Sequence, residues 1–126
     1  MSTTAQYASS PIANGARIAT ANTNRDGTGT LGTVFAPGAN GGRVDEVTIV
    51  ATATTTAGMV RLYRHDGTNV RLWKEVPVSA VTPSGTVQAF TATIIATLIL
   101  GPNESLRAST HNAESFDVHV SVGGGF

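Results

Sequence analysis

The 126-residue chain contains no cysteine, so disulfide bonds, thiolate zinc sites and cysteine nucleophiles are all excluded. Charge is also scarce, because only 13% of the residues are charged, about half of the usual share. Eight basic and eight acidic residues cancel, so the chain lacks the concentrated positive field that nucleic-acid binding normally requires. The surface must therefore consist largely of Thr, Ser, Asn, Gly and Ala, which suits burial against partner proteins.

Long hydrophobic runs are missing as well. The longest apolar stretch, residues 94–100, is interrupted by Thr97 and is far shorter than the ~20 residues that span a bilayer. The first residues, MSTTAQYASSPIANG, have neither the basic nor the apolar region of a secretory signal. We therefore expect no membrane partner. The absence of cysteine favours a protein that is made and assembled in a reducing cytoplasm.

What the sequence does contain is a series of short alternating segments rich in Thr and Val, separated by Gly, Pro, Asn and Asp. No stretch of ten or more residues has the period of an amphipathic helix. Seven or eight strands over this length predict an all-β, jelly-roll-like antiparallel β-sandwich. An immunoglobulin-like sandwich is the alternative, although the Cys…Trp…Cys spacing is absent. The expected strands are residues 16–21, 30–36, 42–53, 86–100, 106–110 and 116–122, and a hairpin whose turn is 65–69.

We expect two parts along the chain: an extended N-terminal arm at residues 1–14 and a single sandwich domain at residues 15–126. The arm is either a frayed terminus or a tail that lies on a neighbouring subunit, which would explain its apolar Tyr7 and Ile12. At the other end, Phe126 follows three glycines, and its ring would make no contact if it were exposed to solvent. We expect it to insert into its own core or into a pocket of a neighbour.

Two segments give predictions about which side chains are buried. In residues 42–53, Val47 and Ile49 fall on one parity, and we expect their side chains to be buried. Val44 and Glu46 share the other parity, which we expect to be exposed to solvent. Residues 94–100 are apolar on both parities. They should be buried on two sides or belong to two strands that meet at a bend.

The segment VRLYRHDGTNVRLWKEV, residues 60–76, repeats Val-Arg-Leu-aromatic on both sides of an Asp-Gly turn, which predicts a β-hairpin. Val60, Leu62, Val70 and Leu72 would form its inner face. Its outer face would carry the four remaining large side chains, Arg61, Tyr63, Arg71 and Trp73. Arginine and aromatic residues are enriched at protein interfaces, so we interpret this face as a contact surface. Cross-strand stacking on a solvated face is the structural alternative, and a carbohydrate platform built on Trp73 and Tyr63 is a third interpretation.

Sequence signatures of chemistry are incomplete. Asn22, Asn24, Asp26 and Gly27 imitate the first half of a calcium loop, but Thr33 stands where the bidentate acid should be, so an Asx-stabilised turn is expected instead. The Gly-rich residues 27–33 lack the Lys of a phosphate loop. The three histidines have no ligand-type partner at metal-binding spacing, and there is no G-x-S-x-G elbow or singled-out carboxylate pair. We therefore predict no catalytic residues, no cofactor and no metal, with a hydrolase as a remote alternative.

The order of these features resembles a family of proteins. The segments ANTNRDGTGT (21–30), GMVRLYRHDGTNVRLWKEV (58–76) and LILGPNESLRASTHNAESFDVHVSVGGGF (98–126) resemble small virion proteins of tailed bacteriophages and prophages. The resemblance covers about residues 15–126 and rests on turn and strand motifs.

This resemblance implies a β-sandwich on the capsid surface of a virion, acting as a decoration or cement protein, with a tail or head fibre as the alternative placement. It implies the major capsid protein or another virion protein as the partner, and self-association, most often as a homotrimer. It carries over no catalytic residue.

Overall fold

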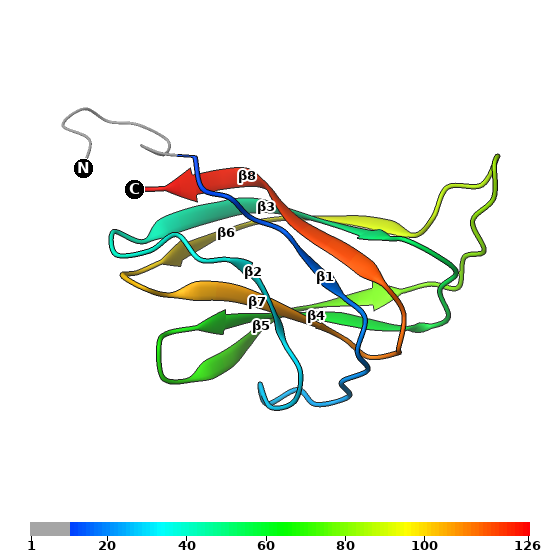
Figure 1. Cartoon of the computed structure of the whole chain (residues 1–126), viewed down its shortest axis with the longest axis horizontal. Coiled ribbons are helices and arrows are strands. Elements are labelled where there is room, and N and C mark those ends of the chain that lie inside the picture. The colour runs from blue at the N-terminus through cyan, green and yellow to red at the C-terminus, as the bar shows by residue number, and fades with distance from the viewer. Residues whose placement is uncertain (1–10) are drawn as a thin grey trace.

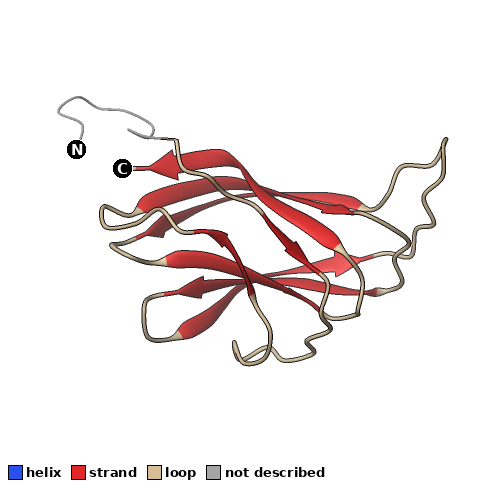
Figure 2. Cartoon of the chain, viewed as in Figure 1, coloured by secondary structure: helices blue, strands red, loops and turns tan. Residues whose placement is uncertain are grey.

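The computed structural model describes residues 11–126, which form eight strands and, within that range, no helix (Figure 2). Tyr7 and most of the predicted arm lie outside the described residues. No helix in the described part is long and apolar enough to cross a membrane. The strands are β1 (Ala16–Ile18), β2 (Gly32–Phe35), β3 (Gly42–Ala51), β4 (Gly58–His65), β5 (Val70–Val78), β6 (Thr91–Leu100), β7 (Ser105–Thr110) and β8 (Phe116–Gly125).

The strands pair antiparallel in two four-stranded sheets, which confirms the predicted β-sandwich (Figure 1). Sheet A has the order β1-β8-β3-β6, and sheet B has the order β2-β7-β4-β5. Consecutive strands alternate between the two sheets everywhere except at the β4–β5 hairpin. In these strand orders, each sheet has one long edge strand, β6 in sheet A and β5 in sheet B. The opposite edges are the short strands β1 and β2.

The core is made of aliphatic side chains and two phenylalanines from the facing sides of both sheets. Phe116 at the start of β8 is 1% exposed and meets Phe90 edge-on, with ring centroids 6.3 Å apart. Edge-to-face packing of this kind adds to the free energy gained by burying the ring area. The fully described part of the predicted arm joins this core, because Ile12 packs against it and Asn14 bridges Phe35 of β2.

A register shift beside Val44 corrects the predicted burial of this residue. Val47, Ile49 and Ala51 are buried as expected, but Val44 is also buried (0% exposed) although it has the parity of Glu46. The register with β6 and β8 shifts between Val44 and Glu46. Val44 and Val47 are three positions apart and both buried, so the parity that faces the core reverses between them.

The prediction for residues 94–100 is wrong in a different way. They belong to one continuous strand, β6, that lies at the edge of sheet A. Leu100 is buried, and Ile94 and Leu98 pack on the core, but the other parity faces outward with Ile95 82% exposed and Ile99 55% exposed. The apolar residues on the second parity are thus not covered within a single copy of the described chain.

Candidate functional site

The predicted Arg/aromatic face does not form a single exposed surface. Arg61 and Tyr63 are 1% and 0% exposed, so the prediction of an outer, solvent-facing position is wrong for both. They do project from the side of β4 that faces away from the core, but the loop of residues 22–31 lies over them. The Tyr63 hydroxyl donates to the Asn24 carbonyl at 2.8 Å, and the Arg61 guanidinium donates to the Asn22 carbonyl at 3.3 Å.

Arg61 is the centre of this buried cluster. Its Nε lies 2.9 Å from Oε2 of Glu75 on β5, and its Nη2 lies 3.2 Å from Nδ1 of His111. Arg25, from the covering loop, bonds the same Glu75 oxygen at 2.8 Å. These hydrogen bonds from Arg25 and Arg61 hold the pKa of Glu75 below its usual range. The cluster therefore fastens the loop to sheet B, and it is internal to the molecule.

Trp73 lies on the opposite side of the hairpin from Tyr63. The register of β4 and β5 shifts so that Leu62 faces Lys74 and Tyr63 faces Leu72, which leaves Trp73 as the extra residue of a bulge. Trp73 consequently packs against the core, and Leu72 is the side chain left 39% exposed. Because Tyr63 is fully buried and Trp73 faces the other way, the two rings form no platform for a sugar.

Arg71 remains on the surface, where it contacts the hairpin turn. Its Nη1 lies 2.6 Å from Oδ2 of Asp66, and Oδ1 of Asp66 accepts the backbone N–H groups of Thr68 and Asn69. Gly67 has a φ of +94°, which the Asp-Gly turn was expected to require. The backbone N–H of Asn69, that of Thr68 and the charge of Arg71 together lower the pKa of Asp66 from 3.8 to about 2.

The turn should therefore lose stability in acid. Because the folded-state pKa of Asp66 is below its ordinary value of 3.8, its contribution is complete above that pH and is lost as the pH falls toward about 2. We expect carboxyl-detected NMR to give a midpoint near 2 for Asp66. We also expect Asp66→Asn to have a weaker dependence of the urea midpoint on pH between 4 and 2. A midpoint near 4 would contradict the turn geometry.

The loop that covers Arg61 is braced by Asn22, which was an incomplete calcium candidate. Asn22 is 5% exposed; its Oδ1 accepts the N–H of Asn24, and its Nδ2 donates to the carbonyls of Thr28 and Thr30. Asp26 similarly accepts the N–H of Thr28, which confirms the predicted Asx-stabilised turns. The side-chain oxygens of Asn22 and Asp26 thus bond the loop itself and do not converge on a common point. Within residues 11–126, His and acidic side chains form no group of three that could hold a metal ion.

Gly27 allows this loop to approach β5 closely. Its φ is +88°, and a Cβ atom added there would lie 2.7 Å from the Cβ of Val70. Both the positive φ and the contact favour glycine at this position. The close approach explains how a loop of polar residues can bury Arg61 and Tyr63 on the outer side of sheet B.

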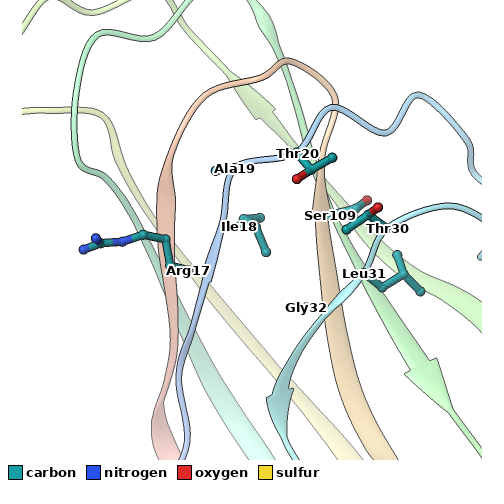
Figure 3. Close-up of a pocket in the computed structure, with 8 residues that line it drawn as sticks. All are labelled: Arg17, Ile18, Ala19, Thr20, Thr30, Leu31, Gly32 and Ser109. Carbon is teal, nitrogen blue, oxygen red and sulfur yellow. The ribbon is translucent and has the colours of Figure 1, made fainter.

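A cavity of about 230 Å³ lies between the chain after β1 and the chain before β2 (Figure 3). Thr20, Thr30 and Ser109 contribute hydroxyls to one end of it, and Ile18 lies in its wall. Arg17, which also lines it, points away and pairs with Asp117 at 2.7 Å. Its lining contains no carboxylate, histidine or lysine, and so offers no pair of groups for acid–base catalysis.

The terminal anchors have different surroundings. Ile12 is partly buried against its own core, and Oδ1 of Asn14 accepts the N–H of Val120 at 2.8 Å. Phe126 is 39% exposed and is fixed by its N–H, which donates to the Gly41 carbonyl. It does not insert into the core of its own sandwich. Of the two predicted positions for Phe126, the pocket of a neighbour is the one that is left.

The most exposed large apolar side chains lie outside the contact surface that the sequence predicted. Ile95 and Ile99 on β6 and Val122 on β8 (40% exposed) all lie on the outer side of sheet A. The register places Ile95 and Val122 on opposite sides of Glu46 in β3. We call Ile95, Ile99 and Val122 the sheet A patch; the two-parity apolar pattern of residues 94–100 was the signal for it.

These features define the described part of the molecule as an eight-stranded antiparallel β-sandwich with one face partly covered by a loop and the other bearing an apolar patch. Comparison with protein-family models, with curated proteins and with solved structures gives no match.

Proposed function

We propose that this chain is a structural protein of a bacteriophage virion, and specifically a capsid decoration protein that binds and stabilises the head shell. The observation that carries the proposal is the sheet A patch, on a chain of which only 13% is charged. Exposed apolar patches on such a surface are typical of sites that are covered in an assembly. The resemblance to small phage virion proteins supports the same assignment.

The arrangement of strands supports a jelly-roll-like form of the sandwich, since consecutive strands alternate between sheets at every connection but one. A decoration protein meets a lattice of identical sites, so modest affinity at each site adds up over a shell. The proposed location is therefore the outer surface of the virion head, the partner is the major capsid protein, and no catalytic step is included. A tail or head-fibre position is the alternative within the same class.

The test uses purified protein and empty head shells of the tailed phage or prophage that carries the gene. We expect the protein to co-sediment with the shells at saturable stoichiometry and to raise their melting temperature. Val122→Lys should weaken this binding about tenfold or more, because it replaces an exposed apolar side chain of the patch with a charged one. Leu72→Lys, on the opposite sheet and similarly exposed in the wild type, is the matched control. Absence of co-sedimentation with shells overturns the head assignment, and binding to purified tails instead would support the alternative.

A further inference from the structure

The four sheet edges of the molecule are not equally protected. A free edge presents unpaired backbone groups, and natural proteins guard such edges with short strands, charges or proline. β1 and β2 are three and four residues long. β5 is long but includes Arg71, Lys74, Glu75 and Pro77. β6 has ten residues, TATIIATLIL, with no charge, no proline and no glycine.

The backbone of β6 is oriented to accept another strand. The N–H of Ala51 donates to the carbonyl of Phe90, and the register then places Val50 opposite Thr91 and Glu46 opposite Ile95. In an antiparallel pair, hydrogen-bonded and non-hydrogen-bonded positions alternate. Thr91 and Ile95 therefore turn their N–H and C=O groups away from β3, toward the free edge.

We propose that the free edge of β6 pairs antiparallel with β6 of a second copy of this chain. A twofold axis perpendicular to the sheet, midway between the two copies of Ile95, would place Ile95 opposite its own copy and Thr93 opposite Thr97. The side chains of these residues all lie on the outer parity of β6, so the pleats of the two sheets match. The pairing joins the two copies of sheet A into one continuous sheet with an isologous interface.

The absence of charge along β6 favours a second copy of the chain as the strand that pairs with its edge. Self-pairing sets each side chain against one of the same strand, and like charges directly opposite each other would oppose it. β6 carries no charge at any of its ten positions, so the twofold register creates no such repulsion. A neutral edge also has no charge with which to select a charged partner strand. The same register sets Thr93 against Thr97, and threonine pairs are favourable cross-strand neighbours.

This inference does not rest on the proposed function. It concerns the edge of sheet A, whereas shell binding is assigned to the face that includes Val122. A β6 pair closes with two copies, so it differs from the homotrimer implied by the resemblance to phage proteins. A third copy would have to use another surface.

The experiment measures molar mass by light scattering during size-exclusion chromatography, with the full chain at several concentrations. We expect about twice the chain mass of 12.9 kDa for the wild type. Ile95→Lys puts two ammonium groups opposite each other at the axis, and should weaken the dimer by about tenfold to a hundredfold. Circular dichroism checks that the variant stays folded, which we expect because Ile95 is 82% exposed.

Two further variants keep the proposal falsifiable. Val122→Lys changes the same face but not the edge, so it should leave the dimer intact; dissociation equal to that of Ile95→Lys would mean face-to-face stacking and would overturn edge pairing. Removal of residues 1–10 should also leave the dimer intact. A monomer after this truncation would show that the arm occupies β6, and a wild-type monomer or trimer would likewise overturn the proposal.

Discussion

Glu75→Gln should lower the free energy of unfolding by about 3 kcal/mol, at the low end of the cost of leaving a buried charge unpaired. Arg61 is 1% exposed and Glu75 is its carboxylate partner at 2.9 Å. A guanidinium cannot escape by losing its proton at any accessible pH. The substitution keeps the size of the side chain, so the loss reports the charge and not a cavity.

Arg25→Ala provides the matched control for this result. Arg25 bonds the same oxygen of Glu75, but its side chain is 62% exposed, so we expect its removal to cost less than about 1 kcal/mol. Chemical denaturation by urea, followed by Trp73 fluorescence and circular dichroism, measures both variants. Equal losses for Glu75→Gln and Arg25→Ala would show that Arg61 is solvated and that the loop does not seal it.

Tyr63→Ala should lower the free energy of unfolding by about 3–5 kcal/mol, because it leaves a cavity beneath the covering loop. Tyr63 is 0% exposed, and its hydroxyl donates to the Asn24 carbonyl at 2.8 Å. Tyr63→Phe keeps the ring and removes only that hydrogen bond, so we expect a loss of about 1–2 kcal/mol. The difference between the two variants separates packing from hydrogen bonding in the same urea experiment.

Hydrogen exchange shows which part of the molecule each Tyr63 variant loosens. The amide of Asn24 donates to Oδ1 of Asn22 within the loop. We expect this amide to lose protection from exchange in Tyr63→Phe while the β3 amides retain theirs. If Tyr63→Ala costs less than about 1 kcal/mol, the side chain lies on the surface and the loop does not cover it. That result would restore Tyr63 as a possible contact residue.

Strand positions were predictable from the sequence because the alternating segments are bounded by Gly, Pro, Asn and Asp. The hairpin turn was predictable for the same reason, since Asp66-Gly67 matches the backbone that the turn adopts. Which face each strand buries was less predictable. The extra residue Trp73 in β5 and the register shift between Val44 and Glu46 in β3 reverse the parity, and a local pattern does not contain the partner strands that reveal them.

The buried position of Arg61 and Tyr63 depends on a contact that no local pattern includes. Asn22 and Asn24 are separated from Arg61 and Tyr63 by 39 residues, and both of them bond through backbone carbonyls, which every residue possesses. The exposure of Ile95 similarly depends on strand order, because the same segment would be covered in the middle of a sheet. The composition of a strand predicts which of its side chains are apolar. The strand order of the sheet decides whether those side chains are buried.

The loop over sheet B makes the molecule directional. With Arg61 and Tyr63 buried beneath residues 22–31, part of one broad side is already covered, and the apolar patch lies on the other. An array assembled through sheet A would have every copy oriented alike, with sheet B, its β4–β5 hairpin and the covering loop on the far side. Such a layer would have a distinct inner and outer surface, and a peptide grafted beside Gly67, where no atom lies within 4 Å of an added Cβ, would be displayed on the outer one.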